Sequence, residues 1–305
     1  MNITGQAPPS SSWPSLVHKE HRKEVTSTQQ VIKDMLKGSD PINVDDVYCI
    51  SADVQTDGKG RGNRHWESPM GMTFGSRRRD HLNFGCAMES ILLFVDKSQV
   101  CRVPGLTQVL AASVANAIDT FLSRKSAKKT QLKWPNDIII QDRKVGGILA
   151  EVVTGYGSEE GKVAVVIGVG VNVEVEDEVL EGLKRARWPA GSLKSSEGFE
   201  WKEDLTVPAL RAAILDKFIS NAKLWKSAPE GCYVPPAISM QVIGRQVMVG
   251  EKVRVSVGEG KVISGTHSGM DEHGYLIVTK DNGEKEFLEL AYSVYFYGDL
   301  RLSGT

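Results

Sequence analysis

Two basic residues of this sequence stand next to unusually bare stretches of backbone. Lys144 is followed by Gly146 and Gly147 in RKVGGILAE, and Arg61 lies in DGKGRGNRHW, where glycines alternate with cations. Glycine weakens a strand interior and marks a bulge or the close approach of a ligand. Backbone N–H groups and positive charges together favour an anion. The two segments therefore predict a binding site for a phosphate or carboxylate group. The alternatives are a solvated basic turn or an RNA contact.

The segment KWPND comes shortly before Lys144. Pro135 has no N–H and stops strand pairing at Trp134, and Asn136 and Asp137 are residue types that start turns. Asp137 and Lys144 face each other across a hairpin-like bend, so they are expected to form a charge pair or to share a ligand. A structural turn with a surface lysine is the alternative.

A third segment, STQQ from Ser27 to Gln30, precedes a run with helical periodicity. Ser27 is a plausible N-cap and Gln30, three residues on, completes a capping box, which is a purely structural role. Free N–H groups at a helix N-terminus also bind polar ligands. A ligand contact is therefore the functional alternative for this segment.

The common nucleotide-binding motifs are absent from the sequence. GSEEGKV is one residue short of a P-loop and ends in valine, and GVGVNV has no third glycine that opens a helix. Neither a P-loop nor a Rossmann fingerprint is supported, and the protein-kinase motif set and the GxSxG elbow are also missing. If ATP binds to this chain, it binds by another scheme.

Hydrophobic periodicity indicates an α+β fold, that is, a sheet with hairpins covered by a few helices. The charged, Gly/Ser-rich segment 174–203 is predicted to be a mobile loop. From about Met240 onward, short strands alternate with glycine turns, and Asn282-Gly283 is a strong hairpin signal, so a small all-β barrel is expected there. The predicted helices are 27–37, 107–122 and 206–226, and the predicted strands before the barrel are 48–55, 90–95, 131–134, 137–140, 145–153 and 163–173.

Composition narrows the class of protein. The 305 residues suit one large and one small domain, and 41% hydrophobic with 25% charged residues is an ordinary globular composition. The net charge of -1 gives no overall attraction to nucleic acid or membrane. No apolar run reaches the roughly 18 residues that span a bilayer. Residues 1–20 show neither a signal-peptide nor a transit-peptide pattern, so we expect a disordered tail and a cytoplasmic protein, or an organellar one if a targeting segment was removed.

Four cysteines, Cys49, Cys86, Cys101 and Cys232, form no CxxC pair and have no histidine at zinc-ligand spacing. Disulfide frameworks belong mainly to small secreted chains. We therefore expect reduced thiols in an intracellular protein, and no metal site built from these residues.

Taken together, KWPND, RKVGGILAE, VIGVGVN, STQ and the GKGRG loop resemble, in order and approximate spacing, the biotin protein ligases (holocarboxylase synthetases). The resemblance covers about residues 24–300 and includes ISGTHSGMDEHGYLIV near the C-terminus. It implies a disordered tail at 1–20, a class II synthetase-like biotin/lipoate ligase domain with a mixed sheet at 21–235, and a small SH3-like β-barrel at 236–305. Members of this family use ATP to form biotinyl-5′-AMP and then transfer biotin to a lysine of a carboxylase carrier domain.

The resemblance also assigns roles to residues. Lys144 and Arg61 would stabilise the charge that develops where biotin's carboxylate meets the α-phosphate, and Asp137 would position Lys144 or Mg²⁺. The loops 57–65 and 174–203 are expected to order over the ligands. Biotin would contact Ser27, Thr28, Gln29, Gln55, Gly58, Lys59, Gly60, Arg61, Lys144, Gly147, Gly168 and Gly170. ATP would contact Arg61, Arg64, Trp66, Lys133, Asn136, Lys144, Asn172 and Trp188.

Some features depart from the family pattern. Lys59 stands where many members have arginine and Asn63 where many have glycine, and because arginine and lysine differ in bidentate contacts, the grip of this loop is expected to differ in detail. Only about 20 residues precede the predicted ligase domain, too few for the winged-helix domain of some bacterial members. We therefore expect no DNA binding, no membrane association, biotin carboxyl carrier domains as partners, and a monomer or homodimer.

Three other functions are alternatives. A lipoate–protein ligase performs the same adenylation chemistry, but STQ and Gln55 favour biotin, whose ureido ring needs polar partners. A non-catalytic SH3-like module with a decayed ligase domain is disfavoured because Lys144, Arg61 and Asp137 are all present. RNA binding through the RGN loop and Arg77–Arg79 rests on charge alone, and the near-zero net charge does not favour it.

Overall fold

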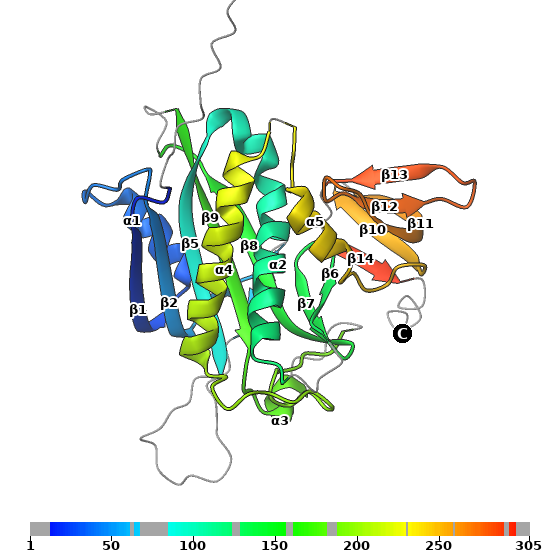
Figure 1. Ribbon diagram of the computed structural model, residues 1–305, viewed down its shortest axis with the longest axis horizontal. Helices are drawn as coiled ribbons and strands as arrows, with labels where there is room; N and C mark the ends of the chain where they lie inside the picture. The colour runs from blue at the N-terminus through cyan, green and yellow to red at the C-terminus, as the bar shows by residue number, and fades with distance from the viewer. Residues whose placement is uncertain are drawn as a thin grey trace, which may run out of the picture.

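A mixed seven-stranded sheet forms the centre of the computed structural model, which describes residues 13–61, 64–67, 85–123, 129–156, 161–181, 188–229, 231–258, 260–289 and 293–296 (Figure 1). Edge strand β1 pairs parallel with β2, and the other neighbouring strands pair antiparallel. The α+β class is therefore confirmed. The strands, in order across the sheet, are β1 (Val17–Val25), β2 (Val47–Gln55), β5 (Cys86–Asp96), β9 (Lys162–Asn172), β8 (Arg143–Val153), β7 (Asp137–Ile140) and β6 (Gln131–Lys133).

Helices cover both faces of this sheet. α2 (Val103–Thr120) and α4 (Val207–Ser227) lie side by side across one face, and α1 (Thr28–Lys37) packs on the other (Figure 1). Because helices lie on both sides of β5, its residues are buried along almost the whole strand, and its sequence is largely apolar rather than alternating. The three predicted helices all form, with ends that differ by a few residues.

The other short elements connect these layers. They are β3 (Gly58–Lys59), β4 (His65–Trp66), the 3₁₀ helix η1 (Lys97–Arg102), α3 (Asp177–Glu181) and α5 (Pro236–Ile243). Strands β3 and β4 pair with each other as a small separate hairpin. Helix α5 packs against α2, and there Asn116 Nδ2 donates to Gln241 Oε1 at 2.6 Å.

The C-terminal region forms a second, five-stranded antiparallel sheet in the order β13-β12-β11-β10-β14. Its predicted hairpin turn is confirmed, because Gly283 adopts a positive φ of 86° between β12 and β13. The indole Nε1 of Trp134, in KWPND, donates to the carbonyl of Gly274 at 3.0 Å and so ties the two sheets together. The strands are β10 (Lys252–Gly258), β11 (Lys261–Met270), β12 (Leu276–Thr279), β13 (Lys285–Leu288) and β14 (Ser293–Phe296).

Two sequence-based expectations about segments were wrong in part. The disordered tail predicted for residues 1–20 overlaps β1, which begins at Val17, and Trp13 is only 7% exposed. The segment 174–203, predicted to be a mobile loop, contains α3 and the fully buried Ser192 and Leu193. In both cases backbone pairing or burial of a few apolar side chains fixes a segment whose overall composition is polar.

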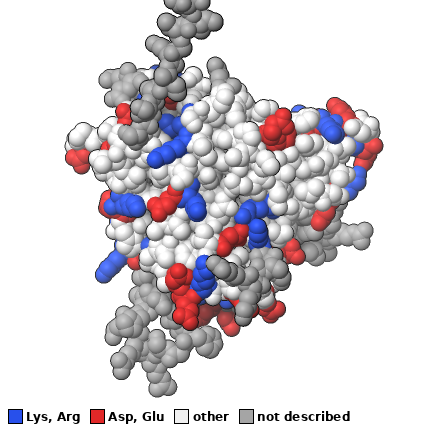
Figure 2. Space-filling model, viewed as in Figure 1, with Lys and Arg blue, Asp and Glu red and all other residues white. Residues whose placement is uncertain are grey.

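Charges are mixed on the face seen in Figure 2, where acidic and basic side chains are interspersed rather than gathered into one patch. This agrees with the net charge of -1. The helices of the described ranges include none with the length and apolar character needed to cross a membrane. All four cysteines are free thiols.

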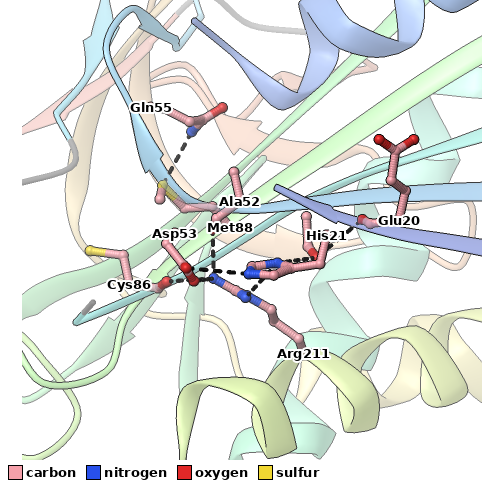
Figure 3. Close-up of polar contacts among 9 residues, drawn as sticks. Glu20, His21, Ala52, Asp53, Gln55, Cys86, Met88 and Arg211 are labelled. Atoms are coloured by element: carbon pink, nitrogen blue, oxygen red, sulfur yellow. Dashed lines mark hydrogen bonds and ion pairs between the residues drawn. The ribbon is translucent and has the colours of Figure 1, made fainter. Parts of the chain in front are cut away.

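Arg211 of α4 ties the edge of the sheet to the helical layer (Figure 3). Its guanidinium donates to the carbonyls of Ala52 and Cys86, at 2.5 and 3.4 Å, and lies 3.3 Å from both Asp53 Oδ1 and His21 Nδ1. Charge-assisted bonds of this kind are stronger than neutral ones. They hold together β1, β2 and β5 close to the end of β2, where Gln55 lies.

A second buried polar group, Glu89 on β5, accepts the S–H of Cys49 at 3.6 Å, and its Oε1 has no partner among the described residues. Burial raises the pKa of Glu89 to about 8, although Cys49, Arg211 and Lys19 act in the opposite direction. Burial also raises the pKa of the Cys49 thiol. Glu89 is therefore protonated in the folded protein at neutral pH.

Glu89 makes stability depend on pH. Between its ordinary pKa of 4.5 and its folded pKa of about 8, the folded state keeps a proton that the unfolded chain has released, so this group's contribution to stability falls as pH rises through that range. We expect Glu89→Gln to flatten the dependence, as measured by urea unfolding at pH 5, 6, 7 and 8. The control is Glu20→Gln, which changes an exposed carboxylate on β1. Parallel curves for Glu89→Gln and the unmodified protein would contradict this prediction.

Candidate active site

A cavity of about 130 Å³ opens where the N-terminus of α1, the β3–β4 hairpin, the turn before β7 and the strands β2, β5, β8 and β9 meet. It collects most of the residues that the sequence predicted to be functional. These are Ser27, Thr28, Gln29, Gln55, Lys59, Gly60, Arg61, Arg64, Trp66, Asn136, Lys144, Gly147, Gly168 and Gly170. Gly58 lies beside them in β3, where a Cβ would come 2.4 Å from the carbonyl oxygen of Trp66, so only glycine fits.

The predicted ion pair between Lys144 and Asp137 forms, with 2.6 Å between Nζ and Oδ1. The hairpin that carries it turns through Gln141 and Asp142, both at positive φ, as in a two-residue type I′ turn. Continuing from this turn, Lys144 pairs with Ile139, which lies on the same face of β7 as Asp137. A register shift follows Lys144 and places Gly147 opposite Asp137, so that Gly147 faces the same side of the sheet as Lys144.

Lys133 also approaches Asp137, with 3.7 Å between Nζ and Oδ2. Burial alone would raise the pKa of Asp137, but Lys144 and Lys133 outweigh it and lower that pKa below 3.8. Burial lowers the pKa of Lys133, although Asp137 opposes this. The carboxylate is therefore ionised at neutral pH and is engaged by two lysines.

The loop after α3 holds the backbone of Lys144 on both sides. Lys144 N–H donates to the Pro189 carbonyl at 2.9 Å, and Gly191 N–H donates to the Lys144 carbonyl at 3.0 Å. Asn172 Nδ2 in turn donates to the Gly191 carbonyl at 3.0 Å. We call residues 188–191 the strap. The strap was not foreseen, because its segment has the composition of a loop.

Arg61 reaches the KWPND turn. Its Nη1 donates to Asn136 Oδ1 at 3.3 Å, while Asn136 Nδ2 donates to the Ile148 carbonyl at 2.9 Å. Arg64 Nε donates to the Arg61 carbonyl at 2.9 Å and so closes this loop. The two cations that the sequence singled out, Arg61 and Lys144, therefore line one cavity.

Glycines form a flat floor between them. A Cβ on Gly170 would lie 2.6 Å from Trp66 Cε2, and one on Gly147 would lie 3.4 Å from both Trp66 and Lys144. The bare backbone thus accommodates the indole of Trp66, whose Nε1 is buried with no partner among the described residues. The resemblance had assigned Trp66 to ATP, yet it lies against glycines that the resemblance assigned to biotin.

Polar side chains form the far wall of the cavity. Gln55 Oε1 accepts from both the N–H and the hydroxyl of Thr28, at 2.8 and 3.1 Å, and Thr28 Oγ1 lies 2.7 Å from Ser90 Oγ. Gln29 Nε2 donates to the Leu149 carbonyl at 2.9 Å, which leaves Gln29 Oε1 buried without a partner among the described residues. This oxygen can accept a hydrogen bond from a ligand.

The capping-box prediction for this helix was wrong. Ser27 is the N-cap of α1, but its side chain makes no capping hydrogen bond. Gln30, the other half of the predicted box, donates instead to Asp34 Oδ1 at 2.8 Å, one turn along the helix. Ser27 is 2% exposed and lines the cavity, so the N-terminal end of α1 faces the site.

Five predicted residues are not among those that line this cavity: Gly58 and Asp137, which lie beside it, and Trp188, Asn172 and Lys133. Trp188 lines a neighbouring one together with Gln131 and Asp142. Asn172 supports the strap, and Lys133 lies behind Asp137. Asn63 is outside the described residues.

Sequence reasoning missed Ser90, which contacts Thr28 from the middle of β5. A serine within a strand that is otherwise apolar and covered on both faces was the signal that could have identified it, because a buried hydroxyl needs a partner.

The arrangement suits a reaction between two anions. Lys144 and Arg61 lie at one end of a cavity whose other end carries amide and hydroxyl groups. Cations fixed in position before reaction stabilise charge that develops on transferring phosphoryl oxygens. The described residues contain no group of three or more His, Cys, Asp or Glu that could hold a metal ion.

Comparison with known proteins gives a consistent picture. Residues 23–172 match the model of the "Biotin/lipoate A/B protein ligase family". The chain is 34% identical over 130 residues to "Biotin--protein ligase 2" of Arabidopsis thaliana, which is 42% of this chain and 33% of the relative. It is 30% identical over 162 residues to "Bifunctional ligase/repressor BirA" of Bacillus spizizenii, which is 53% of this chain and 42% of the relative. The matched part thus spans a third to two fifths of these relatives.

Among solved structures, the chain resembles the biotin protein ligase from Aquifex aeolicus in complex with biotin and ATP. The TM-score is 0.64 at 23% identity, and the match covers 92% of this chain and 99% of the other. At this level of identity, the likeness shows that the fold is shared.

The strap gives a testable prediction about Lys144. A Cβ on Gly191 would lie 2.7 Å from Arg143 Cβ, so we expect Gly191→Ala to displace the strap and speed hydrogen exchange at the Lys144 amide. Gly244→Ala is the matched control, since its Cβ would make only an ordinary contact at 3.4 Å. Exchange measured by NMR or mass spectrometry that is unchanged in Gly191→Ala would show that the strap does not hold Lys144.

Proposed function

We propose that the chain is an ATP-dependent biotin protein ligase that biotinylates a lysine of carboxylase carrier domains, in agreement with the match of residues 23–172 to the biotin/lipoate A/B protein ligase family. One observation supports this most strongly. Arg61 and Lys144 line the same cavity as the polar groups of Thr28, Gln29 and Gln55. A cavity that is cationic at one end and polar at the other matches biotin, which has a carboxylate at one end and a ureido ring at the other.

In the first step, an oxygen of biotin's carboxylate attacks the α-phosphorus of ATP, the bond to the β-phosphate oxygen breaks, and pyrophosphate leaves. Lys144 and Arg61 stabilise the negative charge on the phosphoryl oxygens, and removing one such donor costs about 10²–10³ in rate. Asp137 keeps the Lys144 ammonium in place through their 2.6 Å contact. The product is biotinyl-5′-AMP.

In the second step, the acceptor lysine reacts as a neutral amine. Its nitrogen forms an amide bond with the biotinyl carbonyl carbon, the bond from that carbon to AMP breaks, and AMP leaves with the electron pair. The proton of the amine passes to water. Arg61 and Lys144 again oppose the charge on the leaving phosphate.

The polar wall favours biotin over lipoate as the substrate. Gln29 Oε1 is buried without a partner among the described residues, and a ureido N–H would satisfy it. The dithiolane ring of lipoate has no N–H to donate. The lipoate–protein ligase alternative therefore leaves a buried acceptor unpaired.

The roles of the remaining predicted residues are proposals. Arg64, Lys133 and Asn136 lie next to the reacting cations and act on the phosphates. Asn172 acts through the strap rather than on the nucleotide. The assignment of Trp188 to adenine rests on its position in the sequence.

We propose that Mg²⁺ enters with ATP rather than in a site made by the protein. The described residues form no acidic cluster, and both oxygens of Asp137 already face lysines. The residues present therefore do not fit a separately held ion. Its charge would be balanced by the phosphates that carry it.

The C-terminal sheet is proposed to be an SH3-like barrel. Its last strand, β14, returns to pair with its first, β10, which is the step that begins to close a meander into a barrel. Because α5 packs on α2, we place the domain boundary after α5 rather than at residue 235. The absence of DNA binding, the cytoplasmic location and the oligomeric state stay predictions.

The proposed function is tested by incubating the protein with biotin, MgATP and a biotin carboxyl carrier domain and weighing the acceptor by mass spectrometry. We expect one biotinyl group per acceptor, and lipoate in place of biotin should give none. Lys144→Ala should slow labelling by about 10²-fold or more. Lys162→Ala, which removes a lysine paired with Asp96 outside the cavity, is the control. Absence of labelling by the unmodified protein would refute the proposal.

A further inference from the structure

A second cavity, of about 280 Å³, lies between the larger sheet and the C-terminal sheet. The N-terminus of α2 and the outer half of β8 form one side, with Val103, Pro104 and Val152 among the lining residues. Tyr233, from the segment after α4, and Tyr275, from the β11–β12 turn, form the other side. No role has been assigned to this cavity so far.

This second cavity continues into the proposed active site. Arg61, Ile148 and Leu149 line both cavities. The guanidinium of Arg61, which contacts Asn136, therefore stands at the junction between them. A group that enters through the second cavity arrives beside the position proposed for the reacting acyl phosphate.

The walls of the second cavity suit an alkylammonium group. Aliphatic side chains line the α2 and β8 side, and three aromatic rings face them, with centroid distances of 5.4 Å for Tyr233–Tyr275 and 6.4 Å for Tyr233–His273. Glu289 adds a carboxylate to the lining. Aromatic faces and a carboxylate attract a cation, while aliphatic walls accept a methylene stem.

We propose that the second cavity is the channel through which the acceptor lysine of the carrier domain reaches the biotinyl adenylate. This inference rests on the proposed function and names the surface that its second step uses. The methylene stem lies along Val103 and Val152, and the ammonium is drawn in past Glu289 and the tyrosine rings. It loses its proton to water before the amine attacks the acyl carbon.

A nucleotide fits this channel less well than a lysine. The base edges of a nucleotide need hydrogen-bond donors and acceptors. The amide Nε2 of Gln108 already donates a hydrogen bond to the Pro135 carbonyl at 2.9 Å. The side chains of Val103, Pro104 and Val152 offer none, so that among the described lining residues on the α2 and β8 side only Thr107 and Gln108 carry polar side chains. A phosphate would also meet the carboxylate of Glu289, which would repel it.

Val152→Trp tests the channel, because Val152 is 40% exposed on β8 and a larger side chain there fills the entrance. We expect the burst of pyrophosphate with biotin and MgATP to be retained. Hydroxylamine, a small nucleophile, should still convert the adenylate to the hydroxamate. Labelling of the carrier domain should fall by about 10²-fold, the size of effect that misplacing a reacting group produces.

Val262→Trp is the matched control, since Val262 is a strand valine of similar exposure, 44%, outside both cavities. It should label the carrier domain like the unmodified protein. Labelling at the normal rate by Val152→Trp would overturn the proposal. Loss of its pyrophosphate burst would also overturn it, because the cavity would then serve the first step. Failure of the proposed function itself looks different, since the unmodified protein would then release no pyrophosphate with biotin.

Glu289→Lys keeps the test decisive if Val152→Trp does not fold. Reversing this charge should raise KM for the carrier domain several-fold and leave the pyrophosphate burst unchanged. Added salt should narrow the difference, because screening weakens interactions between exposed charges. An unchanged KM for the carrier domain in Glu289→Lys would contradict the channel.

Discussion

The ammonium groups of Lys144 and Lys133 both lie beside the single carboxylate of Asp137. The rest of the site is arranged around this excess of positive charge. Lys144 lies 2.6 Å and Lys133 3.7 Å from Asp137, so the three groups together carry one net positive charge. Burying such a charge is unfavourable unless another anion compensates it. The arrangement thereby favours a bound phosphate or carboxylate beside Lys144, in the cavity that Arg61 also lines. Since Asp137 stays ionised, the imbalance persists at neutral pH.

Placing Lys144 correctly takes three separate structural devices. The two-residue turn at Gln141 and Asp142 puts its side chain on the same face as Asp137, the strap bonds its backbone on both sides, and Asn172 holds the strap. Two of the three come from segments distant in sequence. Side chains that act on developing charge are useful only when their position is fixed before the reaction, which explains why a single lysine has so much support.

Much of this could be predicted from sequence, and the failures have physical causes. KWPND and RKVGG identified the hairpin and its ion pair because proline, glycine and Asx residues constrain the backbone locally. β1 was missed because it lies at the edge of the sheet and is exposed on nearly its whole length, so its sequence HKEHRKE has no apolar alternation. The strap was missed because its hydrogen bonds are made by backbone atoms, which no side-chain pattern reveals. Ser90 was overlooked because its role depends on Thr28, 62 residues away.

The hydrogen bond from Trp134 to the Gly274 carbonyl joins the two sheets only two residues from Asn136. The indole is almost fully buried, so the smaller sheet cannot swing away without exposing apolar surface and freeing a polar atom within KWPND. Movement of the smaller sheet is therefore energetically coupled to the geometry of the turn. A macromolecule that binds to β11 and β12 would therefore alter the geometry of the KWPND turn without contacting the active site itself.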